Sequence, residues 1–206
     1  IAAKLNSHVE DIDFNPDDFV ARVNSDLVGK YVNIASRAAN FITRHFDGQL
    51  GFVGDTSALQ NELAETARQV CTDFELREYG RAIRRIMAQA DVINQAFDAA
   101  QPWVLAKGIQ TADEATRAKL QDICSRALAG FKALSVMLTP VLPVLTRRVA
   151  QELFGATRDF TWADAAVLPE RVEPFKHLMQ RVDPKQLDAL FERPARPRVR
   201  IGIGAG

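Results

Sequence analysis

Asn33 and Arg37 are the first residues whose types and spacing suggest chemistry. They lie four residues apart in KYVNIASRAANFITRHFDG, residues 30–48. In a helix this spacing puts both side chains on one face, one turn apart, where they can converge on one target. Asparagine offers donors and an acceptor, and arginine offers a planar fork of donors. Such a pair can read the edge of an unstacked base or hold its phosphate. A polar helix face is more often simply solvated, so the spacing alone leaves both interpretations open.

Trp103 is the second residue of interest, because it follows Pro102 in AAQPWVLAK. Proline disfavours a helical conformation in the residue before it, so the Pro-Trp pair is expected at a corner between two helices. An indole at such a corner either fills the core or offers a stacking platform for a splayed base. A tryptophan just after a helix end most often fills the core, so the dipeptide alone is not specific for RNA binding.

Patterns for metal or nucleotide chemistry are missing from the sequence. A di-metal bundle needs Glu-x-x-His pairs, but the residues three before the histidines are Leu5, Ile42 and Pro174. Zinc motifs and a Gly-x-x-x-x-Gly-Lys-Ser/Thr phosphate loop are absent as well. Cys71 and Cys124 fall at apolar helical positions, which predicts two buried thiols, with a disulfide as the alternative. We expect no catalytic residue, cofactor or metal ion here, and an independent helical enzyme is the least favoured hypothesis.

Composition sets the class of protein. The chain has 206 residues with 47% hydrophobic residues and a formal net charge of +0, so it can bury a core but does not coat nucleic acid by bulk charge. A local basic patch is still allowed. Neither an apolar run long enough to span a bilayer nor a signal peptide is found, so no membrane partner is expected. The first residue is Ile1 and the last residues are RPARPRVRIGIGAG; we expect a fragment of a longer protein.

The elements that must position these residues are helices. Asn15 can cap a helix that starts at Pro16 and runs to about Phe46, where Asp47-Gly48 stops it. Apolar periodicity predicts further helices from 56 or 57 to about 74, from about 78 to 101, from about 113 to 138 and through 145–153, with a short one at 184–191. Before Phe160 there is no alternating strand pattern. These elements predict an all-α bundle.

Several longer stretches carry a family resemblance. DFVARVNSDLVGKYVNIASRAANFITRHFDG, LREYGRAIRRIMAQAD, AAQPWVLAK, TPVLPVLT and VEPFKHLMQRVD closely resemble the anticodon-binding domain of bacterial methionyl-tRNA synthetases, which are class I aminoacyl-tRNA synthetases. The likeness covers residues 4–182. It implies an antiparallel helical bundle of the class I synthetase anticodon-binding type, with a looser C-terminal segment.

The resemblance also implies roles for the residues singled out above. Asn33 and Arg37 match the family's residues that bind the anticodon loop. Trp103 matches the tryptophan that stacks on the first anticodon base, the cytosine of CAU, and Pro102 shapes its corner. The implied partners are the initiator and elongator methionine tRNAs. By position, three further residues are candidate phosphate contacts, with solvated charge as the alternative for each: Arg44, Lys107 and Arg22. Asp98 is expected to be a surface residue.

The family's ATP-binding motifs and its zinc-binding knob are absent from the sequence. The resemblance therefore implies that the parent protein is a cytoplasmic methionine–tRNA ligase. Its absent N-terminal catalytic domain would bind ATP and Mg²⁺, and also Zn²⁺ in those family members that bind zinc. The expected division is a connecting segment at 1–14, the anticodon-binding bundle at 15–155, a segment packing back on the protein at 156–193, and a basic, glycine-rich tail or linker at 194–206. The alternative function is a helical protein-interaction or scaffold domain with no RNA role.

Overall fold

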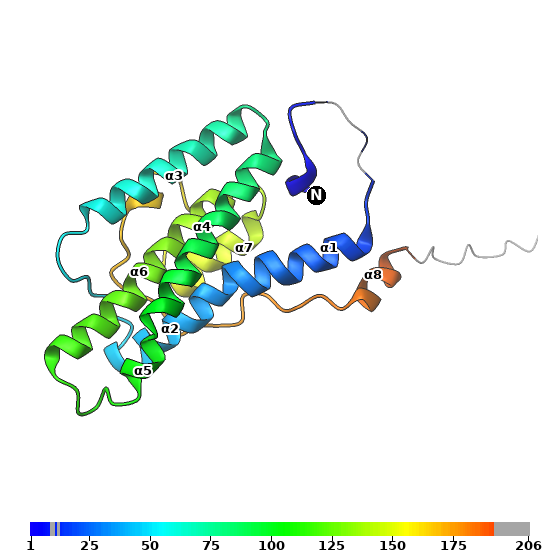
Figure 1. Cartoon of the computed structure of the whole chain (residues 1–206). Helices are drawn as coiled ribbons and strands as arrows, with labels where there is room; N and C mark the ends of the chain where they lie inside the picture. The colour runs from blue at the N-terminus through cyan, green and yellow to red at the C-terminus, as the bar shows by residue number, and fades with distance from the viewer. Residues whose placement is uncertain (9–10, 12, 192–206) are drawn as a thin grey trace, which may run out of the picture.

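The computed structural model describes residues 1–8, 11 and 13–191. Within these residues the fold is a bundle of helices (Figure 1), and the strand-like pairing that they contain is one isolated antiparallel bridge between Gln49 and Arg171. The predicted all-α class is confirmed. The whole of the expected tail or linker, residues 194–206, lies outside the described residues. So do the last two residues of the segment expected at 156–193.

The helices follow the expected order. They are η1 (Ala2–Lys4), α1 (Pro16–Arg22), η2 (Val23–Val32), α2 (Asn33–Phe46), α3 (Ser57–Glu75), α4 (Tyr79–Ala100), α5 (Pro102–Ala106), α6 (Glu114–Leu138), α7 (Pro143–Arg148), η3 (Val149–Leu153), η4 (Trp162–Ala166) and α8 (Pro184–Phe191).

The helix predicted from Pro16 to Phe46 is continuous through α1, η2 and α2. The Asn15 side chain accepts a hydrogen bond from the backbone N–H of Asp18 at 3.0 Å and caps its start. It ends where Asp47 and Gly48 take the left-handed conformation, with φ of 50° and 77°. The sequence did not predict that η2, its middle section, is π-helical. Both predicted ends of the helix are confirmed.

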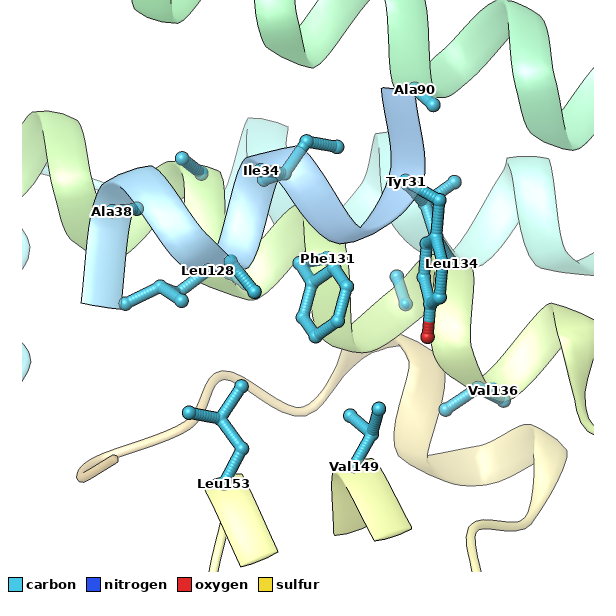
Figure 2. Close-up of a cluster of buried hydrophobic side chains, with 14 of the residues drawn as sticks. Tyr31, Ile34, Ala38, Ala90, Leu128, Phe131, Leu134, Val136, Val149 and Leu153 are labelled. Carbon is cyan, nitrogen blue, oxygen red and sulfur yellow. The ribbon is translucent and has the colours of Figure 1, made fainter. Parts of the chain in front are cut away.

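The core is centred on α6. From Leu128 to Leu138 every residue of this helix is buried, so its C-terminal half is enclosed on all sides rather than lying at a surface. The Tyr31 ring stacks on Phe131 with ring centroids 4.7 Å apart (Figure 2). Tyr31 Oη and Ser135 Oγ are 2.7 Å apart and share a hydrogen bond, which satisfies both buried hydroxyls.

Helices α3 and α4 form an antiparallel hairpin tied by a buried acid. Asp73 is 4% exposed and accepts hydrogen bonds from Arg81 Nε at 2.7 Å and Arg85 Nε at 3.1 Å. Both arginines belong to α4, and Asp73 belongs to α3. Because a buried carboxylate needs a paired cation, this cluster fixes how the two helices meet.

The segment that follows η3 returns along the bundle and pairs with it. Val172 N–H donates to Gly48 O at 2.8 Å, and Leu50 N–H donates to Glu170 O at 2.8 Å. Farther on, the Asn24 side chain donates to Val182 O at 2.9 Å and accepts from Val182 N–H at 2.8 Å. Helix α8 then lies against α1 (Figure 1).

Gly48 is the tightest point of this return. Its φ is positive, and a Cβ there would collide with the Val172 carbonyl oxygen. Gly54 has a similar φ of 75°, but nothing lies within 4 Å of a Cβ added to it.

Gly54→Ala should therefore lower the free energy of unfolding only by the cost of a positive φ in a residue with a side chain, about 1–2 kcal/mol. Gly48→Ala should cost at least about 2 kcal/mol more, because the returning segment at Val172 must move. Urea unfolding of both variants measures the difference, and equal losses would contradict the close approach.

Candidate nucleic-acid interface

A row of three polar pairs joins η2 and α2 to α4, and we call it the polar ladder. Each pair links residues 61 positions apart in the chain, so the two helical segments run parallel and in register. The pairs are Lys30 Nζ to Asp91 Oδ2 at 2.8 Å, Asn33 Nδ2 to Asn94 Oδ1 at 3.5 Å, and Arg37 Nη2 to Asp98 Oδ1 at 2.5 Å.

Arg37 is the best-anchored residue of the ladder. Besides its ion pair with Asp98, its guanidinium carbon lies 4.9 Å from the centre of the Phe97 ring and 5.4 Å from the centre of the Trp103 ring. Both distances are within the range of cation–π attraction. The structure thus brings Arg37 and Trp103 together, although 66 residues separate them in the chain, and it holds the guanidinium plane in place.

Trp103 stands at the predicted corner. Gln101 has φ of 46° and ends α4, and Pro102 occupies the first turn of α5 and is buried. Trp103 itself is 37% exposed, so an indole filling the core is the wrong interpretation of this residue. Pro102 positions the turn, and Trp103 presents its ring beside Arg37 at the surface.

Asn33 and Lys30 complete the N-terminal part of the ladder. Asn33 is half-buried and lies one turn before Arg37 on the same helix. The hydrogen bond from Lys30 to Asp91 raises the pKa of the Lys30 ammonium, with burial acting in the opposite direction. Lys30 is therefore a charged partner of α4 at neutral pH rather than a free cation.

The candidate phosphate contacts are not all near this cluster. Arg44 and Lys107 are exposed, Arg44 two turns beyond Arg37 on α2 and Lys107 just after α5. Arg22 lies fifteen residues before Arg37, which is roughly 20 Å along the helix, and its Nε pairs with Asp18 Oδ1 at 3.1 Å. The structure keeps Arg44 and Lys107 at the Trp103 end of the bundle and places Arg22 at the opposite end.

Comparisons with known proteins decide the family. Residues 1–39 match the family described as tRNA synthetases class I (M). Methionine–tRNA ligase of Janthinobacterium sp. (strain Marseille) is 49% identical over 98% of this chain, and that of Methylibium petroleiphilum is 50% identical over 96%. The chain belongs to the methionyl-tRNA synthetase family. It spans 29% and 28% of the length of these two relatives.

Solved structures agree at the level of the fold. The apo form of Mycobacterium tuberculosis methionyl-tRNA synthetase superposes with a TM-score of 0.72 at 22% identity, covering 83% of this chain and 35% of that one. The same enzyme in complex with methionyl-adenylate gives a TM-score of 0.71 over 82% of this chain and 34% of that one. The helical bundle is thus one that methionyl-tRNA synthetases contain.

Three residues of the site were missed by sequence reasoning. Asp98 is a surface residue as expected, but its ion pair with Arg37 was not foreseen, and Phe97 and Asn94 were not singled out as partners of Arg37 and Asn33. A signal was nevertheless present, because Asp91, Asn94 and Asp98 repeat the spacing of Lys30, Asn33 and Arg37. Matching spacing on two helices indicates faces that can pair in register when the helices run parallel.

Other chemistry is sparse in the described residues. They contain no group of three or more histidine, cysteine or acidic residues that can hold a metal ion. Among them, too, no helix has both the length and the apolar character needed to cross a bilayer. Both cysteines are free thiols. Burial of Cys124 is confirmed and raises its pKa to about 12, whereas the predicted burial of Cys71 is wrong because it is only half-buried.

Because the Arg37–Asp98 pair is partly exposed to solvent, Arg37 should matter little for stability. The two side chains are 29% and 56% exposed, and such ion pairs contribute up to about 1 kcal/mol. We expect Arg37→Ala to cost at most about 1.5 kcal/mol with the cation–π contacts included. Ile34→Ala, on the buried face of the same helix at 3% exposure, should cost about 2–5 kcal/mol. Urea unfolding compares them, and a loss for Arg37→Ala as large as that for Ile34→Ala would show that the ladder is a structural element.

Proposed function

We propose that this chain is the anticodon-recognition module of a methionyl-tRNA synthetase and binds the CAU anticodon of initiator and elongator methionine tRNAs. The observation that carries the proposal is the Arg37 guanidinium held against the half-exposed Trp103 ring, with Asn33 one turn away. These three residues occupy one end of a bundle that belongs to this family.

The geometry suits recognition of an unpaired loop. Anticodon bases can be turned outward, which is the usual route to sequence-specific reading of RNA. The exposed face of Trp103 can stack on such a base, and stacking contributes about 1–3 kcal/mol per base. Arg37 and Asn33 lie beside that ring with donors and an acceptor for the edge of the base. Pro102 keeps the indole at the corner, and Arg44 and Lys107 are placed for backbone phosphates.

The proposal extends to the whole enzyme. The relatives are named methionine–tRNA ligases, and the Mycobacterium tuberculosis enzyme binds methionyl-adenylate. We assign to the parent of this chain the ATP-dependent joining of methionine to its tRNA, with ATP and Mg²⁺, and Zn²⁺ where present, in its catalytic part. Residues 1–14 then connect that part to the bundle at 15–155, and residues 156–193 pack back on the protein. A cytoplasmic location follows from the same assignment.

A scaffold domain without an RNA role is the alternative function. It requires the Trp103 and Arg37 face to be buried in the fold or covered by another protein. Trp103 is 37% exposed, and no feature of the described residues favours a protein partner on this face. We therefore retain the anticodon module alone.

The direct test is binding of this chain to two anticodon stem-loop hairpins, CAU and GAU, at one fixed moderate salt concentration. Salt must be fixed because phosphate contacts make the affinity depend on it. We expect a clear preference for CAU. Equal affinity for the two hairpins would contradict anticodon recognition by this chain.

Trp103→Ala provides the first site test, and Trp162→Ala is its matched control. Trp162 is 36% exposed but lies in η4 beside Phe74, away from the ladder. Loss of one stacking contact should weaken CAU binding by about 1–3 kcal/mol, or roughly 5- to 150-fold. Trp162→Ala should leave the affinity as it is. Affinity by fluorescence anisotropy and unfolding by circular dichroism are measured on both variants, and similar affinities for the two would refute the stacking role.

Salt dependence separates the candidate phosphate contacts. Each phosphate contact to a single-stranded region contributes about 0.7 to the slope of log K against log salt. Arg44→Ala and Lys107→Ala should each lower the slope by about this amount. Arg22→Ala, which removes a cation from the opposite end of the bundle, should not change it. A slope that falls only in Arg22→Ala would place the RNA on a different face.

A further inference from the structure

Asn94 has a side-chain orientation that its neighbours dictate. Its Nδ2 donates to Ala90 O at 3.0 Å, within α4, and to Lys30 O at 3.1 Å, across on η2. Carbonyl oxygens only accept hydrogen bonds, so the end of the amide that faces them must be the NH₂ group. Both N–H bonds of Asn94 are used in this way, and the opposite orientation would set its oxygen against two carbonyl oxygens.

The orientation of Asn94 passes to Asn33. Asn94 Oδ1 faces Asn33, whose Nδ2 lies 3.5 Å away and donates to it. This bond is long, but turning the Asn33 amide over would bring two acceptor oxygens together. Asn33 therefore keeps its NH₂ group toward Asn94 and its Oδ1 turned away from α4. Among the described residues, no donor is bonded to this oxygen.

The neighbouring ion pairs hold the two amides in place. Lys30–Asp91 lies one turn before Asn33, and Arg37–Asp98 lies one turn after it. They fix η2 and α2 against α4 from both sides, so Asn33 cannot slide past Asn94. The site then presents one fixed acceptor, Asn33 Oδ1, next to the donors of Arg37.

We propose that Asn94 is a positioning residue that makes Asn33 select an anticodon base with an exocyclic amino group. This inference rests on the proposed function. Cytosine and adenine carry an amino donor beside a ring-nitrogen acceptor on the Watson–Crick edge. The amino group can donate to Asn33 Oδ1, and the ring nitrogen can accept from the Arg37 guanidinium. Uracil and hypoxanthine carry a keto oxygen beside a ring N–H, so their keto oxygen would face Asn33 Oδ1, and two acceptors would meet. CAU offers an amino group at its first and second positions and none at its third.

The test uses three hairpins that each differ from CAU at one position. UAU replaces the amino group of the first base by a keto oxygen, and CIU, with inosine, does the same at the second base. CAC changes the third base and serves as the control position. Asn94→Ala should lower the discrimination against either UAU or CIU by about tenfold, the value of one well-placed hydrogen bond, and should leave the discrimination against CAC unchanged.

A second variant separates positioning from a structural effect. In Asn33→Asp both side-chain ends are acceptors, so orientation no longer matters. Asn94→Ala should then cause no further change in selectivity, and the two effects should be strongly non-additive. The proposal would be overturned if Asn94→Ala lowered discrimination equally in the unsubstituted chain and in Asn33→Asp. It would also be overturned if the loss were equal at all three anticodon positions.

The RNA-free chain gives an independent reading. The heteronuclear NOE of the Asn33 side-chain amide should indicate an ordered NH₂ group, and Asn94→Ala should make it mobile. An Asn33 amide that is equally ordered, or equally mobile, in both proteins would overturn the positioning role even if no hairpin is bound. Absence of any CAU preference in the unsubstituted chain would instead refute the proposed function, so the two failures are distinguishable.

Discussion

The parallel, in-register packing of η2 and α2 beside α4 is the constraint on which the rest of the site depends. Both segments rest on α6, whose C-terminal half is buried on every side. Each flanking helix therefore turns an apolar face inward, and its polar residues must lie toward its neighbour or the solvent. Since the pairs of the ladder share one offset, a shift of either helix would break all three at once. The register thus places Arg37 against the end of α4, where the chain turns at Pro102.

Stability and the proposed recognition come from different parts of this arrangement. The buried contacts of Tyr31 with Phe131 and Ser135 involve fully desolvated groups, so they bear directly on folding. The ladder is half-exposed, and ion pairs in that setting contribute little free energy to folding. The ladder supplies orientation instead, because a guanidinium in contact with two rings and an amide held by a second amide lose less conformational freedom when a ligand binds. The side chains of the polar face are therefore held in defined orientations, although they contribute little to the free energy of folding.

Local signals in the sequence were enough for the helices and for part of the site. Asn15-Pro16 and Asp47-Gly48 carry capping chemistry that acts within a few residues, so both ends of the long helix were predictable. The nearness of Arg37 and Trp103 came from resemblance, because no local rule relates residues on separate helices. The π-helical geometry of η2 and the exposure of Cys71 depend on how neighbouring elements pack, which periodicity does not encode. Arg22 was named a candidate phosphate contact by its position in the sequence, although fifteen residues of helix separate it from Arg37.

Charge balance explains what kind of recognition this face can perform. The net charge is +0, and within the ladder the cations Lys30 and Arg37 are each matched by an acid from α4. In the described part of the chain near Trp103, Arg44 and Lys107 are cations without an ion pair, so bulk attraction for a polyanion is weak there. Under the proposed function, the phosphate contacts of Arg44 and Lys107 add affinity that does not depend on the base, so selectivity must come from stacking and from hydrogen bonds to base edges. A face built in this way would bind RNA poorly unless the right bases were presented to it, and the proposed anticodon module needs that property to distinguish one anticodon from others on similar backbones.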